Sequence, residues 1–266
     1  MLEKNCISSL YLSTDAITSL SLEVDDPNKR NNASIRSNFI SIADIDLFLS
    51  KYNHKNNYDD GKTKLHVGDS IQLIDGIYNT IWQIAGFDCE HNRTAANGTV
   101  YDNGYGIALI PYFPYLPQDV WNSTTTISGG YKGSTANTSI LPTIATNLKN
   151  TTLGSHLVNR NVLLSSSVES NYVSTAMTWT TAEATLMSMG QLTGAFGLNS
   201  GFYDDGEANY KLPLFNYTTY NHLRVAFWLR GTGGGSGKVH IVDEDGYNDQ
   251  RSVTNSYYYR PLIYIR

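Results

Sequence analysis

Two stretches near the carboxy terminus decide the fold of this chain: Phe227-Trp228-Leu229-Arg230 and Arg260-Pro261-Leu262-Ile263. Each is an apolar run of strand length, and residues 238–242 form a third run of the same kind. The turn Asp243-Glu244-Asp245-Gly246 follows that third run, and an Asp-Gly pair is a strong hairpin signal. We therefore expect a compact, aromatic-rich α+β domain, with Trp228 in its core and the Arg260-Pro261 segment closing it.

Strand patterns also occur further upstream. Residues 65–73 alternate in polarity and residues 77–87 resume the pattern, which predicts a β-hairpin. Residues 106–110 predict a third strand, after which a long loop rich in Pro and Tyr leads to Trp121. Residues 162–165 predict a short buried strand.

Two helices are expected in the same part of the chain. One lies within residues 134–155, where aliphatic side chains recur at helical spacing and Pro142 starts or interrupts the helix. The other covers residues 179–189, with Thr180 or Thr181 as its cap. Two glycines are expected to stop this second helix, Gly190 and Gly194.

The amino-terminal part shows weaker patterns. Residues 7–24 predict one or two strands. Residues 42–49 predict a short helix with one apolar face, capped by Ser41 or Asp44.

A domain boundary is expected near residue 62. The polar, Asn-rich residues 52–64 are typical of a linker. Residues 1–62 are then a small β-rich segment for docking or oligomerisation, and residues 63–266 are the main domain.

The composition favours a recognition protein. Charged residues make up 16% of the chain against about 25% in ordinary proteins, while Tyr occurs 19 times. Rigid Tyr rings and small polar side chains are what binding surfaces use, because they give contact area at small entropic cost. The formal charge of −5 and the absence of basic runs disfavour nucleic-acid binding. No apolar run has the length of a signal peptide or a membrane span, so we expect neither Sec export nor membrane insertion.

Motifs for catalysis and metal binding are weak. The Gly-rich residues 231–237 lack the Lys-Ser/Thr ending of a phosphate loop and the spacing of a nucleophile elbow. The six histidines are dispersed and expected at the surface, and Cys6 and Cys89 form no metal-ligand cluster. We therefore expect no catalytic residue, no metal and no cofactor, and the chain is not predicted to be an enzyme.

Two acidic groups leave an alternative open. Residues 243–245 and the group Asp204, Asp205 and Glu207 are interpreted as solvated loops. Two carboxylates about 5–10 Å apart in a cleft would instead indicate a carbohydrate-active enzyme.

The best candidates for a binding site are polar and aromatic residues that flank the last strands, and we expect them on loops. They are Tyr247, Asn248, Asp249, Arg251, Asn255, Tyr257 and Tyr258. A tyrosine-rich subunit interface is an equally good interpretation. Replacing Tyr247 and Tyr257 by Ala is expected to weaken binding while changing stability by no more than about 0.5 kcal/mol.

Several short motifs follow one another in a recognisable order along residues 65–266. They are Trp82 in an early strand, the sequence Val-Leu-Leu-Ser-Ser-Ser-Val-Glu at 162–169, Tyr-Lys-Leu-Pro-Leu-Phe at 210–215, and the two carboxy-terminal stretches. This order resembles a poorly characterised family of bacterial and bacteriophage proteins. In that family a Trp-Leu-Arg-Ser strand and a terminal Arg-Pro strand close a C-type-lectin-like domain, similar to the formylglycine-generating-enzyme fold.

The resemblance implies a C-type-lectin-like domain with short antiparallel sheets and two helices. Gly231 stands where the family has Ser, and residues 1–62 have no counterpart. The copper-binding cysteines of formylglycine-generating enzymes belong to the carboxy-terminal half, where this chain has none, so their activity is not implied.

The resemblance also implies a role on a virus particle, because phage members are virion proteins and related domains present variable side chains for host recognition. We therefore expect a bacteriophage virion protein, either a tail fibre that binds a receptor or a head fibre that decorates the particle. Its partners would be other virion proteins, further copies of itself as in a trimer, and a glycan or protein of the host surface. The alternatives are a bacterial surface adhesive domain and a carbohydrate-active enzyme.

Overall fold

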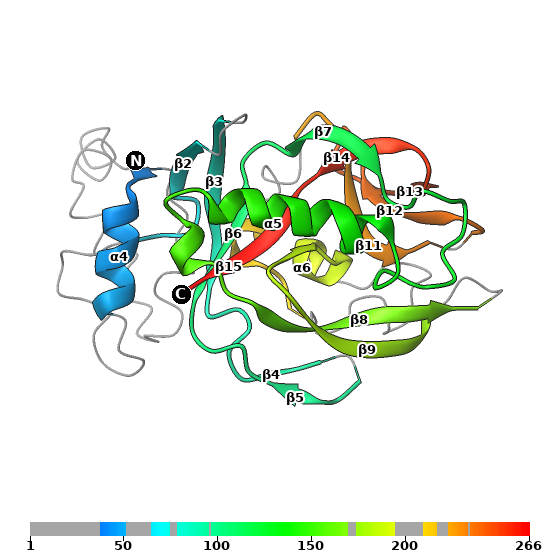
Figure 1. Cartoon of the computed structure of the whole chain (residues 1–266), viewed down its shortest axis with the longest axis horizontal. Helices are drawn as coiled ribbons and strands as arrows, with labels where there is room; N and C mark the ends of the chain where they lie inside the picture. Colours follow the sequence, from blue (N-terminus) through cyan, green and yellow to red (C-terminus); the bar gives the residue numbers. More distant parts are fainter. Residues whose placement is uncertain are drawn as a thin grey trace, which may run out of the picture.

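The computed structural model describes residues 38–51, 65–74, 79–95, 97–169, 174–194, 210–216, 223–233 and 235–266. These residues form a mixed α+β structure in which strands predominate and pair in several sheets, together with three α-helices (Figure 1). The predicted α+β class is therefore confirmed.

The larger sheet has six strands in the order β1-β2-β3-β6-β15-β10. Their bounds are β1 Phe39–Ile40, β2 Ser70–Ile74, β3 Asn79–Phe87, β6 Ile107–Pro111, β15 Pro261–Ile265 and β10 Ala184–Leu186. β1 joins β2 in parallel, and the other neighbours are antiparallel. The last strand of the chain, β15, thus lies inside the sheet, and all residues of β6 and β15 are buried. Strands covered on both faces have continuous apolar sequences, which is why these runs could be recognised.

The second sheet has five strands in the order β13-β12-β11-β14-β7. Their bounds are β13 Asn248–Ser252, β12 Lys238–Val242, β11 Phe227–Thr232, β14 Ser256–Tyr259 and β7 Tyr115–Val120. β11 and β14 are parallel, and the remaining pairs are antiparallel. The strands expected at the two carboxy-terminal stretches and at residues 238–242 are confirmed by β11, β15 and β12.

Arg260 links the two sheets, since it stands between β14 and β15. Its guanidinium is fully buried and lies 5.3 Å and 5.5 Å from the ring centroids of Phe215 and Phe227. Its Nε donates a hydrogen bond of 3.1 Å to the carbonyl of Pro111. Burial lowers the pKa of Arg260 to about 9. The Arg260-Pro261 step is therefore part of the core where the sheets meet.

Two smaller pairs and several helices complete the structure. The pairs are β4 Arg93–Thr94 with β5 Val100–Tyr101, and β8 Arg160–Val168 with β9 Ser174–Ala182. The α-helices are α4 Ile42–Lys51, α5 Leu141–Lys149 and α6 Met189–Thr193. A π-helix, η1 Ala136–Ile140, leads into α5, and the 3-10 helices are η2 Gly154–His156 and η3 Pro213–Asn216. Figure 1 shows α5 lying across one side of the sheets.

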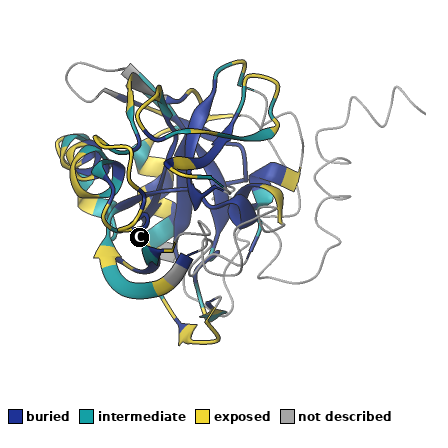
Figure 2. Cartoon of the chain, turned by 90° about the vertical axis from the view of Figure 1, so that its right-hand side faces the viewer, coloured by how far each residue is buried: buried dark blue, intermediate teal, exposed yellow. Residues whose placement is uncertain are grey.

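One hydrophobic core connects most of these elements. It includes Ile45 and Phe48 of α4, Trp82 of β3 and Trp228 of β11, all of which are buried. In Figure 2 buried strands occupy the interior, while exposed residues gather on hairpin ends and on outer helix surfaces. Trp179 of β9 is half-buried and packs in a smaller cluster with Ala95, Tyr101, Leu163 and Met177.

Several local predictions are confirmed. The hairpin of β2 and β3 and the strand β6 occur where expected. The helix predicted at 42–49 is α4. At its start the backbone N–H of Ser41 donates a hydrogen bond to the Asp44 carboxylate, and the backbone N–H of Asp44 donates one to the Ser41 hydroxyl. The helix expected near Pro142 is α5, with the proline in its first turn.

The helix predicted over residues 179–189 is wrong. The structure places β9 and β10 there, and β9 pairs with β8 along its length. The sequence Thr178-Trp179-Thr180-Thr181 combines β-branched and aromatic side chains, which favour strands over helices. A helix begins only at Met189, with Ser188 as cap, and ends at Gly194 in the left-handed conformation (φ 78°).

Three further strand predictions need correction. β8 extends well beyond the predicted residues 162–165. The predicted loop before Trp121 contains β7. Residues 247–259, expected as loops, contain β13 and β14.

The predicted strands at 7–24 and the linker at 52–64 lie outside the described residues. β1 and α4 precede the expected boundary near residue 62, and α4 contributes Ile45 and Phe48 to the main core. The boundary itself stays a prediction.

Candidate functional site

The predicted site residues do not form one patch. Asn248, Asp249 and Arg251 lie on β13, whereas Tyr257 and Tyr258 lie on β14. β12 and β11 separate these two strands, so three strand spacings, roughly 14 Å, lie between them. Tyr247 and Asn255 are exposed in turns beyond opposite ends of β13.

Most of these side chains are already engaged within the protein. Asn248 Oδ1 lies 2.9 Å from Nδ1 of the buried His240. Arg251 and Asp249 form an ion pair. Tyr257 packs edge-on against buried Trp228, with ring centroids 4.9 Å apart, and Tyr258 packs against the core. Among the tyrosines of the predicted site, only Tyr247 has most of its surface exposed, namely 70%.

These contacts correct two expectations. The residues lie mainly on strands, where they hold the sheet together, rather than on a loop scaffold. Tyr257→Ala is no longer expected to be neutral for stability, because it removes a packed aromatic pair.

The acidic turn at 243–245 has a structural role. Asp243 Oδ1 accepts hydrogen bonds from the backbone N–H groups of Asp245 (3.1 Å) and Tyr247 (2.8 Å). Gly246 adopts φ 85°, as the hairpin turn requires. The second acidic group, Asp204, Asp205 and Glu207, lies outside the described residues.

The described histidines and Cys89 are buried or paired within the protein, as expected of residues with a structural role. His66 and His240 are buried, so the expectation that the histidines lie at the surface is wrong for these two. His91 and His156 pair with Asp102 and Asp46 at 2.9 Å and 2.8 Å. Burial raises the pKa of the Cys89 thiol to about 12, so it is not a reactive thiolate at neutral pH. Three predicted positions lie outside the described residues: Cys6, His54 and His222.

A buried ionic network joins the loop after β3 to β8. Glu90 and Arg160 are both fully buried and form an ion pair. Glu90 also accepts hydrogen bonds from Tyr210 Oη at 3.1 Å and Asn103 Nδ2 at 2.8 Å, and Arg160 Nη2 donates to Thr185 Oγ1 at 3.1 Å. Burial, followed by the charge of Glu90, raises the pKa of Tyr210 well above its ordinary value. The network therefore fixes the loop after β3, β8 and β10 relative to one another.

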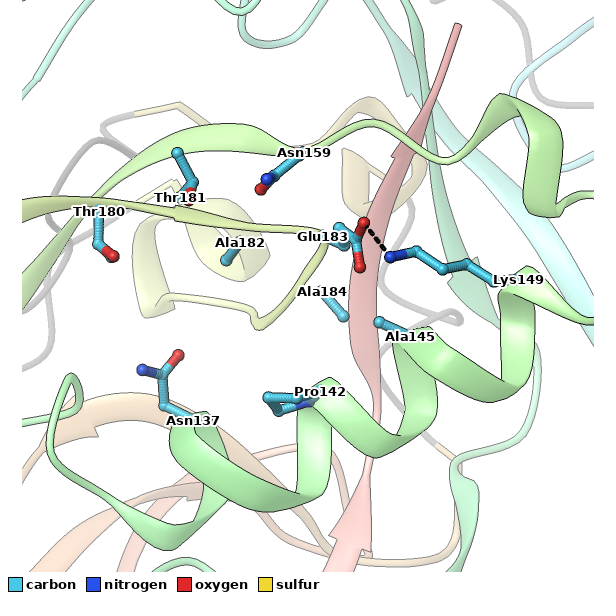
Figure 3. A pocket seen from close by; sticks show the side chains of 10 residues that line it. All are labelled: Asn137, Pro142, Ala145, Lys149, Asn159, Thr180, Thr181, Ala182, Glu183 and Ala184. Carbon is cyan, nitrogen blue, oxygen red and sulfur yellow. Dashed lines mark ion pairs between the residues drawn. The ribbon is translucent and has the colours of Figure 1, made fainter.

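A candidate site is the groove between α5 and the turn from β9 to β10 (Figure 3). Its volume is about 360 Å³, at the lower end of the range of about 300–1,000 Å³ for small-ligand sites. It is lined by Asn137, Pro142, Ala145, Lys149, Asn159, Thr180, Thr181, Ala182, Glu183 and Ala184. Because consecutive residues of β9 line it, the groove follows the edge of that strand rather than one face.

The floor and walls of the groove come from different elements. Ala145 of α5 and Ala184 of β10 are buried and lie toward each other across the floor. The apolar stripe of α5, which includes Ala145 and Leu148, holds the helix against the core. Asn159 and Thr181 are exposed and form part of the rim.

A π-helix positions one wall of the groove. Asn137 belongs to the π-helix η1. Such turns are rare in proteins overall, and those that occur are often found at functional sites. Its Nδ2 donates a hydrogen bond of 3.0 Å to the carbonyl of Lys132. Figure 3 shows the amide at the end of the groove that faces Thr180, with its carbonyl oxygen on the groove side.

An ion pair closes the other end of the groove. Lys149, in the last turn of α5, pairs with Glu183 in the turn between β9 and β10 (Figure 3). The side chains are 49% and 23% exposed, respectively. The two charges largely offset each other, so the groove presents hydroxyls, amides and methyl groups to a ligand.

The lining does not resemble the site of a glycoside hydrolase. Among the described residues that line the groove, Glu183 is the one carboxylate, and that chemistry ordinarily uses two. Among the residues that the structure describes, no three His, Cys, Asp or Glu side chains form a group that could hold a metal ion. None of the helices described there has the length and apolar character needed to cross a membrane.

Sequence reasoning did not identify the groove. In the sequence, Thr180 and Thr181 indicate a helix cap and Pro142 a helix start. The groove forms because residues 137–149 lie against Asn159 and residues 180–184, and no local pattern records that contact.

Comparisons with family models, with curated proteins and with solved structures find no match to this chain.

Proposed function

We propose that this chain is a non-enzymatic recognition module of a bacteriophage virion that binds a host-surface glycan in the groove between α5 and β9–β10. One observation carries the proposal: the groove offers hydroxyl, amide and methyl groups with its two charges paired. Sugars present hydroxyls and C–H faces, and such a lining complements both.

The composition supports recognition over catalysis. The chain is poor in charged residues and rich in Tyr and small polar residues, which is typical of binding surfaces. The overall charge of −5 disfavours nucleic acid as the ligand.

The virion assignment and the C-type-lectin-like fold rest on the resemblance of the ordered motifs between Trp82 and Ile263. Two of these motifs lie in β11 and β15, where they contribute to the core. In this proposal residues 1–62 contact other virion proteins, and several copies of the chain act together. Multivalency would give useful avidity from weak single sites.

The residues first proposed as the site have a secondary part in this function. Tyr247 and Asn255 are exposed and remain candidates for contacts with a neighbouring copy. Asn248, Asp249, Arg251, Tyr257 and Tyr258 support the sheet that carries these turns.

The test is binding of the purified full chain to an array of immobilised bacterial surface glycans. Thr180→Phe places a ring in the groove, on a strand where aromatic residues are favoured. Ala176→Phe adds the same ring at an exposed position of the same strand outside the groove, and serves as the matched control. We expect the wild type and Ala176→Phe to bind the same glycans and Thr180→Phe to lose them. Absence of wild-type binding to every glycan, or unchanged binding by Thr180→Phe, would contradict the proposal.

A further inference from the structure

We propose that β13 is an interface for a second copy of this chain, in which the β13 strands of two copies pair antiparallel around a two-fold axis at Gln250. The inference concerns assembly and is independent of glycan binding in the groove. It follows from three features of β13: its position at a sheet edge, the direction of its backbone groups and its charge pattern.

β13 forms one end of the five-stranded sheet. It pairs with β12, and no described strand pairs with its other side. Its residues, Asn248–Ser252, are all partly or fully exposed. An edge strand of this kind presents backbone N–H and C=O groups that can pair with another strand.

Alternate residues of β13 direct their backbone groups outward. Asp243 N–H donates a hydrogen bond of 2.9 Å to the carbonyl of Tyr247 at one end of the hairpin. Val253 N–H donates one of 2.8 Å to the carbonyl of Gly237 at the other end. Hydrogen-bonded pairs recur at every second residue of an antiparallel ladder, so the odd-numbered residues of β13 bond β12. The backbone groups of the even-numbered residues therefore point away from β12.

In the single chain, two charged side chains cover the central backbone groups. Gln250 N–H donates a hydrogen bond of 2.6 Å to Asp249 Oδ1, and its carbonyl accepts one of 3.2 Å from Arg251 Nη1. Asp249 and Arg251 also form an ion pair, and their side chains are 35% and 44% exposed. They lie on the same face of the strand because they are two positions apart. A second strand can therefore replace them at Gln250 while both stay on the surface of the sheet.

The charges of β13 are self-complementary in one register. With Gln250 opposite Gln250 of the second copy, Asp249 of each copy lies opposite Arg251 of the other. Opposite residues of antiparallel strands have Cβ atoms about 4.5–5.5 Å apart, so two ion pairs form across the axis. The backbone groups of Gln250 then bond their counterparts in the second copy.

The neighbouring registers are unfavourable. Antiparallel pairing keeps the outward backbone groups opposite one another only when one strand shifts by an even number of residues. The nearest such shifts place Asp249 opposite Asp249, or Arg251 opposite Arg251, and like charges directly opposite each other are destabilising. The charge pattern thus selects the register with Gln250 on the axis.

This arrangement closes as a dimer. Both copies use the same strand, so the contact is isologous and leaves no β13 edge for a third copy. The two five-stranded sheets become one continuous sheet.

The test is sedimentation velocity of the purified full chain over a range of concentrations. We expect the wild type to reach a monomer–dimer equilibrium. Asp249→Lys and Arg251→Glu each turn both ion pairs across the axis into like-charge pairs, so each should dimerise at least about tenfold more weakly. Glu169→Lys makes the same charge change as Asp249→Lys at an exposed position outside β13, and should dimerise like the wild type.

An equimolar mixture of Asp249→Lys and Arg251→Glu tests the register. Each substituted side chain then meets an opposite charge on the other variant, so the mixture should dimerise about as well as the wild type. Recovery in the mixture also shows that both variants are folded.

The remaining outcomes overturn the inference. A wild type that stays monomeric up to its solubility limit, or that forms a trimer, overturns the β13 dimer. Association that neither single variant weakens places the contact elsewhere. A mixture that stays as monomeric as its two components overturns the register. None of these results bears on glycan binding, which the array measures separately.

Discussion

At the scale of single residues, buried polar contacts account for much of the structure. Glu90 and Arg160 are the clearest case, because both side chains are removed from water and each bonds several partners. Breaking such a pair leaves one charge buried without compensation.

Glu90→Gln should therefore destabilise the protein by about 3–5 kcal/mol, as measured by urea unfolding. Asp249→Asn, which breaks the partly exposed pair with Arg251, is the control and should cost about 0–1 kcal/mol. Equal effects of the two substitutions would show that the buried pair contributes no more than a surface pair.

Substitution of two tyrosines of the site predicted from sequence should affect the stability of the protein differently. Tyr247 is 70% exposed, so Tyr247→Ala should change the unfolding free energy by no more than about 0.5 kcal/mol. Tyr257 packs edge-on against buried Trp228, so Tyr257→Ala should cost about 1–3 kcal/mol from lost burial and the aromatic pair. Thermal unfolding of both variants tests the difference, and a neutral Tyr257→Ala would mean that this packing is unimportant.

These residues show what a sequence can predict at this scale. Trp228 was recognised as core because it lies in an apolar run. Tyr257 has the sequence signature of a binding residue, because its partner, Trp228, is 29 positions away and becomes its neighbour only through the parallel pairing of β11 with β14. Residue type is visible in a sequence, but a cross-strand neighbour is not.

At the scale of elements, local signals were recognised where the chain itself supplies them. The start of α4 is set by Ser41 and Asp44, whose groups bond one another within one helical turn. The helix expected over residues 179–189 is wrong although residues 178–181 favour a strand locally, and the pairing with β8 that fixes the end of β9 as a strand comes from outside this window.

The start of α4 gives a pH-dependent prediction. Hydrogen bonds from the Ser41 hydroxyl and then from its backbone N–H lower the pKa of Asp44 below its ordinary value of 3.8. A carboxylate with a lowered folded-state pKa stabilises the protein above its ordinary pKa, and this contribution is lost as the pH falls through the lowered value. Asp44→Asn should thus cost about 0.3–1 kcal/mol at pH 7 and nearly nothing in strong acid.

Urea unfolding of the wild type and of Asp44→Asn, at pH values from 7 down to strong acid, measures the difference in unfolding free energy directly. Ser41→Ala is a useful comparison, because loss of the cap should cost about 1 kcal/mol at neutral pH. A difference for Asp44→Asn that stays constant into strong acid would rule out the carboxylate as its source.

At the scale of the whole molecule, the amino-terminal helix belongs to the main core. Ile45 and Phe48 are buried, Phe48 lies 5.3 Å from the ring of Phe87, and Asp46 pairs with His156. A boundary near residue 62 would separate these side chains from their partners.

A fragment of residues 63–266 should therefore be less stable than one of residues 38–266, by several kcal/mol for the two lost apolar side chains. Thermal unfolding of both fragments provides the comparison. Equal melting temperatures would support the boundary near residue 62 and show that α4 adds little.

The groove also belongs to this scale. Its polar lining could be anticipated, because a chain rich in Asn and Thr will line most of its hollows with such residues. Its position could not, because it depends on how α5 docks against β9 and β10, two strands that the sequence pattern had assigned to a helix.

The most direct test of glycan binding in the groove is a backbone NMR titration of the full chain with the bacterial glycan that binds best on the array. We expect the amide signals that shift to lie in residues 137–149 and 180–184, with residues 247–258 unaffected. Shifts confined to residues 247–258 would contradict this account and return the binding site to the tyrosine-bearing turns.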